Sequence, residues 1–235
     1  MERFGRISEI DPGAERTWQD RVFLTLDIDW AHDEVLAACI DLVEQAGVAA
    51  TWFITHDTPL LQRLVANPRF ELGIHPNFNP LLAGETAMKP EAVLERLLGL
   101  VPQARSVRSH SLVQSTGLHQ LFAARGLTHD CNHYVPHQSG IALRPWPLWT
   151  GLVKVPHFWE DDLACAYGVG LPEGPATAGL QVYDFHPIHV FLNTETLERY
   201  ERTRPLHRSP RELLAHRHAG AGTRTWLLQL LERAA

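Results

Sequence analysis

Two aspartates at the end of an apolar run are the strongest chemical signal in the chain. Asp27 and Asp29 close the segment 24–29, and residues two apart on a β-strand point to the same face. Two carboxylates on one buried face repel each other, and a cation between them relieves that repulsion. One carboxylate can then ligate a divalent metal ion while the other accepts a proton from water activated by the ion. We therefore predict a metal-dependent hydrolytic site here.

A histidine follows a second apolar run. His75 ends the predicted strand 70–75, and Asn79 lies four positions later. Histidine is the commonest metal ligand among side chains, and an amide oxygen can share the same ion. We expect His75 to be a metal ligand and name Asn79 as a further candidate.

A third polar pair closes a short predicted strand at 106–110. Arg108 and His110 lie two residues apart, so their side chains share a face of that strand. A guanidinium stays charged and forks onto carboxylates, so Arg108 is expected to pair with the catalytic carboxylate and keep it ionised. His110 is a second candidate for an imidazole ligand.

The last apolar run, 181–192, is interrupted by polar residues. His186 is the candidate for the acid that protonates a leaving group, and Asp184, on the same face, is expected to orient it or to tune its pKa. His189 is the alternative acid.

Two further residues are candidates for contact with substrate. Asp130 ends a predicted strand at 127–130, and Trp159 lies in the aromatic and acidic segment 158–162. An indole there could stack on a sugar ring, although a packed loop is the more common explanation for such a segment.

Strand-like and helix-like segments alternate along the chain, which predicts right-handed βαβ units, a parallel sheet and the α/β class. A (β/α) barrel places chemistry at the carboxyl ends of its strands, where these candidates fall. We predict one domain over 1–235, with a core at about 21–192, long irregular loops over 131–180 and a C-terminal helical extension over 209–233, opened by a capping box at 209–212. Strands are predicted at 22–29, 48–55, 70–75, 106–110, 127–130, 152–156 and 181–192, and helices at 33–46, 58–67, 90–100, 117–125 and 223–233.

Composition excludes several classes of function. The net charge of −6 and the lack of any basic run argue against nucleic acid as a partner. No window approaches the roughly eighteen apolar residues that a membrane span needs. The N-terminal residues lack the apolar core of a signal peptide. Three cysteines, far apart in sequence, do not form a disulfide framework, and we expect a cytoplasmic location.

Taken together, these segments resemble the polysaccharide deacetylase (NodB-homology) superfamily over residues 21–192. Segment 25–30 is similar to its first motif, Thr-Phe-Asp-Asp-Gly, with Ile28 inserted between the two aspartates; the roles of base and ligand are therefore exchangeable. Segment 73–79 is similar to the second motif, His-(Ser/Thr)-x-x-His, with Asn79 in place of the second histidine. Segment 108–111 resembles the Arg-x-Pro-Tyr motif, and His186 resembles the histidine of the last motif.

The resemblance implies a distorted (β/α) barrel of the seven-stranded type and a metal-dependent removal of acetyl groups from sugars. It implies metal ligation by Asp29, His75 and either His110 or Asn79, with Asp27 as base, Arg108 beside it and His186 as acid. Mixed nitrogen and oxygen donors suit zinc and also allow nickel, cobalt, manganese or iron. Signal-less members occur in surface-polysaccharide and O-antigen biosynthesis, so an acetylated sugar or oligosaccharide is the expected substrate.

Two alternatives stay open. The same groups could hydrolyse another carbon–nitrogen bond, such as a formamide or a cyclic amide. The chain could also be a non-catalytic carbohydrate-binding remnant, which the replacement at Asn79 allows. The sequence leaves the sugar, the linkage and the oligomeric state open.

Overall fold

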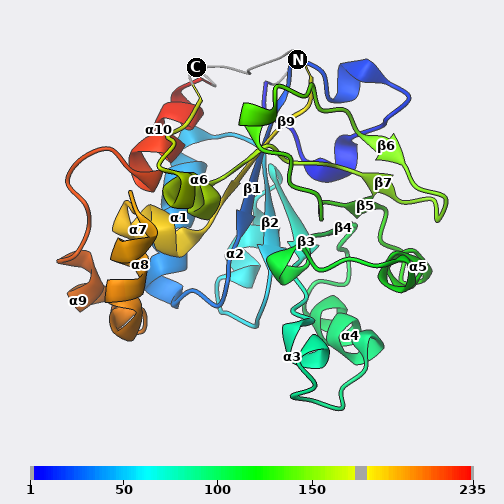
Figure 1. Cartoon of the computed structure of the whole chain (residues 1–235), viewed down its shortest axis with the longest axis horizontal. Helices are drawn as coiled ribbons and strands as arrows, with labels where there is room; N and C mark the ends of the chain where they lie inside the picture. Colours follow the sequence, from blue (N-terminus) through cyan, green and yellow to red (C-terminus); the bar gives the residue numbers. More distant parts are fainter. Residues whose placement is uncertain (1–2, 173–178, 234–235) are drawn as a thin grey trace.

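A computed structural model of the chain describes residues 3–172 and 179–233. The terminal residues of the predicted domain 1–235, and residues 173–178 of the predicted loop region, lie outside this description. Within it, a central sheet carries helices on both sides (Figure 1). The strands are β1 (Val22–Asp27), β2 (Ala50–Ile54), β3 (Phe70–Ile74), β4 (Ser106–Val107), β5 (His129–Asp130), β6 (Trp146–Pro147), β7 (Val153–Lys154), β8 (Trp159–Glu160) and β9 (Gln181–Phe185).

Helices connect most of these strands and follow the last one. They are α1 (Asp33–Ala46), α2 (Leu61–Ala66), α3 (Asn79–Leu82), α4 (Pro90–Leu100), α5 (Thr116–Ala124), α6 (Asp161–Tyr167), α7 (Pro187–Leu192), α8 (Leu197–Thr203), α9 (Pro210–Leu214) and α10 (Thr223–Glu232). Two short 3₁₀ turns matter for the site, η3 (His110–Leu112) and η5 (Arg204–Leu206).

The sheet is almost entirely parallel and curls into a half-barrel, in agreement with the predicted class. Its strand order is β6-β7-β5-β4-β3-β2-β1-β9-β8, and within the described residues β6 alone runs antiparallel to its neighbour. The strands number nine rather than seven because short pairs at 146–147 and 159–160 extend the two edges. The centre, β2-β1-β9, is fully buried apart from Gln181, as expected for strands covered by helices on both faces.

Several boundaries follow from local chemistry. Helix α1 has the predicted bounds, because His32 caps its N-terminus and Gly47 ends it in the left-handed region, at φ 63°. The predicted strand 181–192 is wrong in its second half. Pro187 has no N–H for the ladder and occupies the first position of α7 instead. All six residues of α7 are buried, so its sequence resembles a buried strand.

Two further predictions differ from the structure. The expected capping box at Ser209 does not form, since the Ser209 side chain makes no cap hydrogen bond to α9. The region predicted as loops contains β8 and α6, which sequence patterns missed.

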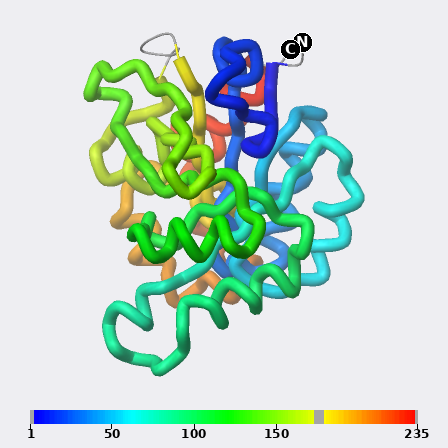
Figure 2. Tube along the Cα trace, turned by 90° about the vertical axis from the view of Figure 1, so that its right-hand side faces the viewer, coloured from blue at the N-terminus to red at the C-terminus, as the bar shows by residue number. Residues whose placement is uncertain are grey.

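The two ends of the described chain meet on one side of the molecule. The Arg3 guanidinium donates a hydrogen bond to the carbonyl oxygen of Arg233. Figure 2 shows the segment from α3 to α4 at the opposite end of the molecule. Across the described residues, every helix is too short or too polar to cross a bilayer.

Candidate metal centre

The chain turns sharply after β1 and places its two aspartates differently from the prediction. Asp27 is the last residue of β1, whereas Asp29 lies beyond the strand with φ 35°, and Trp30 follows with φ 52°. Positive φ in a non-glycine residue is uncommon and costs energy. The expectation that both carboxylates share one face of a strand is therefore wrong. They meet through a third residue.

That third residue is His75, which follows β3. Its Nδ1 lies 3.2 Å from Asp27 Oδ2, and its Nε2 lies 3.2 Å from Asp29 Oδ1. The two carboxylates thus face opposite nitrogens of one imidazole. Burial alone lowers the pKa of His75, but the carboxylates of Asp27 and Asp29 outweigh it and raise that pKa above its ordinary value.

His110 approaches the same point from the turn η3. The strand β4 ends at Val107, so His110 owes its position to this turn and not to the predicted strand. Its backbone N–H donates to the Pro76 carbonyl oxygen at 3.0 Å, and its ring packs edge-on against Trp30. Its Nδ1 lies 3.3 Å from His75 Nε2 and 3.5 Å from Asp29 Oδ1.

These three atoms form a nearly equilateral triangle with edges of 3.2, 3.3 and 3.5 Å. Ligand bonds of about 2.0–2.2 Å at tetrahedral angles place neighbouring donors about 3.3–3.6 Å apart. Asp29 Oδ1 is also buried and lacks an aligned hydrogen bond within the described residues. Burial acts to raise the pKa of Asp29, but the nearby His110 and His75 side chains hold it well below its ordinary value. The donor set fits a divalent cation.

Asn79, the alternative ligand, has a different partner. Its side-chain nitrogen donates to Ser111 Oγ at 3.0 Å, and its backbone N–H bonds to the Asn77 side chain. The structure therefore brings Asp29, His75 and His110 together, with Asn79 engaged in the adjacent loop.

Arg108 lies behind the triangle, fully buried under Asp27. Its Nη1 donates to Asp27 Oδ1 at 2.9 Å, to Thr25 Oγ1 at 3.0 Å and to Asp184, and the guanidinium lies over the Phe53 ring. Two carboxylates share one guanidinium, and burial raises the pKa of Asp184 to about 7 despite that contact. Asp184 therefore pairs with Arg108 and does not orient His186, although its charge helps to raise the pKa of His186.

Asp161, which sequence patterns did not single out, orients His186. Its Oδ1 lies 2.7 Å from His186 Nδ1, and its Oδ2 accepts the His186 backbone N–H at 2.9 Å. The Nε2 side of the ring faces Asp29 Oδ2 at 3.8 Å. Burial alone lowers the pKa of His186, but the Asp161 carboxylate dominates and raises it well above its ordinary value. A raised pKa favours the protonated ring, which is the form that a general acid uses.

The two residues predicted to contact substrate lie in the interior. Trp159 is 2% exposed, packs against Phe185 and Trp226, and donates its indole N–H to the Gly170 carbonyl oxygen. Asp130 is fully buried beside Lys154 at 3.1 Å. An indole or carboxylate with no exposed surface cannot stack on or bond to a sugar, so neither position fits the expected role.

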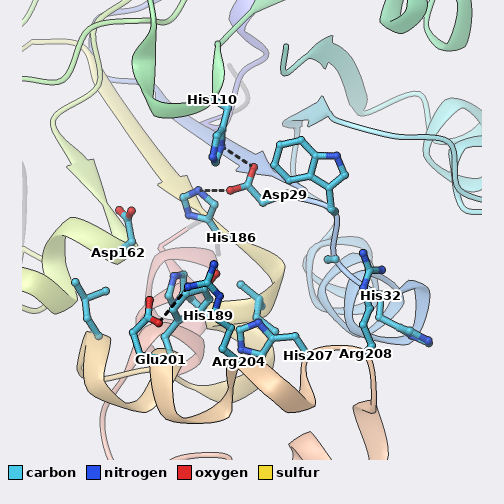
Figure 3. Close-up of a pocket in the computed structure, with 15 residues that line it drawn as sticks. Asp29, His32, His110, Asp162, His186, His189, Glu201, Arg204, His207 and Arg208 are labelled. Carbon is cyan, nitrogen blue, oxygen red and sulfur yellow. Dashed lines mark hydrogen bonds and ion pairs between the residues drawn. The ribbon is translucent and has the colours of Figure 1, made fainter. Parts of the chain in front are cut away.

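A cavity of about 480 Å³ opens over Asp29, His110 and His186. Its opposite wall consists of residues of α8, of η5 and of the turn before α1, as Figure 3 shows. This size is typical of small-molecule sites, which occupy about 300–1,000 Å³.

Comparison with known proteins places the chain among carbohydrate-modifying enzymes. A family model of WbmS-like polysaccharide deacetylases matches residues 24–204. The crystal structure of a protein from Bordetella bronchiseptica, assigned as a polysaccharide deacetylase involved in O-antigen biosynthesis, is 51% identical, with a TM-score of 0.96 over 100% of this chain and 99% of that chain. A protein assigned as a polysaccharide deacetylase from Mycobacterium smegmatis is 16% identical, with a TM-score of 0.48 over 91% of this chain and 90% of that chain. No curated protein matches the chain significantly.

Proposed function

The chain belongs to the family of WbmS-like polysaccharide deacetylases, and from this premise we propose that it uses a divalent metal ion to remove an acetyl group from a sugar of the O-antigen pathway. The N-acetyl group is the primary candidate, and the O-acetyl group is the alternative. The observation that carries the proposal is the triangle of Asp29, His75 and His110 at the cavity, beside a His186 that Asp161 orients. The predicted cytoplasmic location stays a prediction.

Asp29, His75 and His110 would hold the ion. Two nitrogens and one oxygen suit zinc and also allow nickel, cobalt, manganese or iron. A bound ion of this kind lowers the pKa of water and polarises the carbonyl of the acetyl group.

Asp27 is proposed to accept the proton of the attacking water. The contact with Arg108 stabilises the charged carboxylate, which a proton acceptor needs. The contact of Asp27 Oδ2 with His75 Nδ1 supports a second role, since carboxylates commonly orient ligating imidazoles. Mutation separates these roles.

His186 is proposed to protonate the departing nitrogen or oxygen. Asp161 holds Nδ1, so the proton available for transfer is at Nε2, on the side of Asp29. Protonation of the leaving group is needed because an amide anion leaves far more slowly than a neutral amine.

Acetate release from metal-loaded protein tests the proposal. We expect turnover on an acetylated sugar, loss of turnover with a chelator, and recovery when zinc is added back. His75→Ala should lose both the metal and activity, whereas His216→Ala, at an exposed histidine that does not line the cavity, should keep both. Asp27→Asn should retain the metal and lose about 10²- to 10⁴-fold in kcat, the usual contribution of an acid–base group.

Three results would redirect the assignment. Near-normal activity of Asp27→Asn contradicts the base role, and loss of metal from that variant supports the role in orienting His75. Release of formate instead of acetate supports a different carbon–nitrogen hydrolase. Failure to bind any divalent ion under any loading condition supports the carbohydrate-binding remnant.

A further inference from the structure

The cavity has two chemically different ends. Asp29, His110 and His186 line one end, where the proposed reaction occurs. Arg204, His207 and Arg208 lie across the cavity from them, together with His32 (Figure 3). These basic residues come from the segment that follows α8 and from the turn before α1, and none belongs to the proposed catalytic group.

The acidic residues that line the same cavity neutralise only part of the positive charge of these basic residues. Glu201 pairs with Arg204 at 3.4 Å. Asp162 lies near the His186 ring, and Asp29 belongs to the proposed metal site. Arg208 makes no ion pair or hydrogen bond with any residue that the structure describes. In a chain of net charge −6, this leaves an uncompensated guanidinium facing the cavity.

His32 adds a directed hydrogen-bond donor to the cavity that Arg208 lines. Its Nδ1 accepts the backbone N–H of Glu34 at 3.2 Å, as the cap of α1. In the neutral ring the proton therefore sits on Nε2, which is free to donate. Both residues line the cavity, and Figure 3 labels them on the same side of it.

A buried histidine connects the two ends. His189 is 4% exposed, lines the cavity and packs its ring against those of His186 and Tyr200. Its Nδ1 has no hydrogen-bond partner among the described residues. Burial lowers the pKa of His189 and so favours the neutral ring, a polar group without charge. Such a group suits the hydroxyl groups of a sugar.

We infer that the acetylated sugar carries an anionic oxygen group, which Arg208 and His32 bind at the end of the cavity opposite the metal centre. Guanidinium groups bind carboxylates and phosphates in a forked geometry. Two kinds of sugar carry such an anionic group. A uronic acid carries a carboxylate, and a sugar nucleotide carries a diphosphate. This inference rests on the proposed deacetylase function and narrows its substrate.

Binding to metal-loaded protein tests the inference without relying on turnover. The probes are an N-acetylhexosamine, the corresponding N-acetylated uronic acid and a uridine-diphosphate-linked N-acetylhexosamine, titrated by calorimetry. We expect one anionic probe to bind about tenfold or more tightly than the neutral sugar, a difference that disappears at high salt. Whichever anion binds identifies the source of the charge.

Arg208→Gln should remove this preference and leave the affinity for the neutral sugar unchanged. Arg202→Gln is the matched control, because Arg202 is exposed on α8 and does not line the cavity. Arg208→Lys should restore part of the preference. In turnover, Arg208→Gln should raise KM for the anionic substrate about tenfold and leave kcat unchanged.

The anion site and the deacetylase function can be refuted independently of each other. Equal binding of neutral and anionic probes, or an unaltered preference in Arg208→Gln, overturns the anionic substrate while acetate release still supports the deacetylase. Binding that depends on Arg208 without acetate release from any probe overturns the deacetylase and retains the anion site.

Discussion

At the scale of single residues, one imidazole organises the proposed centre. His75 faces Asp27 with one nitrogen and Asp29 with the other, so it separates the two carboxylates that the sequence places two positions apart. The left-handed backbone at Asp29 and Trp30 makes this possible. Backbone strain of this kind persists where the surrounding structure imposes it, here where the proposed metal ligands converge.

The pH dependence of activity should reveal the pairing of Asp161 with His186. An acid must carry its proton, so activity should fall as pH rises through the pKa of His186. Asp161 raises that pKa, and Asp161→Asn should therefore move the alkaline limb of kcat/KM to lower pH. Profiles of metal-loaded protein measure this shift. Asp162→Asn is the control, since Asp162 makes no hydrogen bond to the ring, and an equal shift in both variants would contradict the assignment.

At the scale of elements, strand β3 must approach both its neighbours closely to aim His75. Gly73 lies two residues before His75, and a Cβ built there would lie 2.7 Å from the Phe53 ring and 2.8 Å from the Ser106 carbonyl oxygen. The same Phe53 ring supports the Arg108 guanidinium at 4.7 Å. The glycine therefore sets the spacing of three strands and, through Phe53, the position of Arg108.

Gly73→Ala should consequently destabilise the protein by about 1–3 kcal/mol, the usual cost of overpacking a core. Gly99→Ala provides the control within helix α4, where a Cβ would meet no atom within 4 Å. That change should stabilise the fold by about 0.5–1 kcal/mol because alanine favours helices over glycine. Chemical denaturation measures both, and equal effects would refute the packing explanation.

At the scale of the whole molecule, the C-terminal segment completes the hydrophobic core. Leu227 and Leu230 of α10 are fully buried in the same cluster as β1 and α1. Asn193 ties this helix to the end of α7, because its side-chain oxygen accepts the backbone N–H groups of Arg224 and Thr225. The predicted C-terminal helical extension is thus packed into the hydrophobic core of the domain.

Two neighbouring leucines of α10 test this packing. Leu227→Ala removes a fully buried side chain and should cost about 2–5 kcal/mol of unfolding free energy. Leu228→Ala, at a position that is 37% exposed, should change it by no more than about 0.5 kcal/mol. Denaturant titrations of the two variants check the difference, and a small effect at Leu227 would show that α10 is dispensable for folding.

Much of the fold was predictable because its signals are local. The helix 33–46 and the strand 70–75 follow from apolar periodicity and from residues that cap or end an element. The strand predicted over 181–192 failed because a short helix buried on all sides has no periodic polar face. The edge strand β8 and helix α6 have two and seven residues, too few to produce a distinct pattern.

The sequence by itself determined the α/β class, the family resemblance and the candidates for the metal site: Asp29, His75 and either His110 or Asn79. Their types and their places after apolar strands are local properties. Tertiary structure alone decided that Asp161 rather than Asp184 orients His186, that Asn79 bonds to Ser111, and that Trp159 and Asp130 are buried. Partners so distant in sequence meet through turns and packing, and no local pattern records which of several nearby side chains a backbone turn will bring into contact.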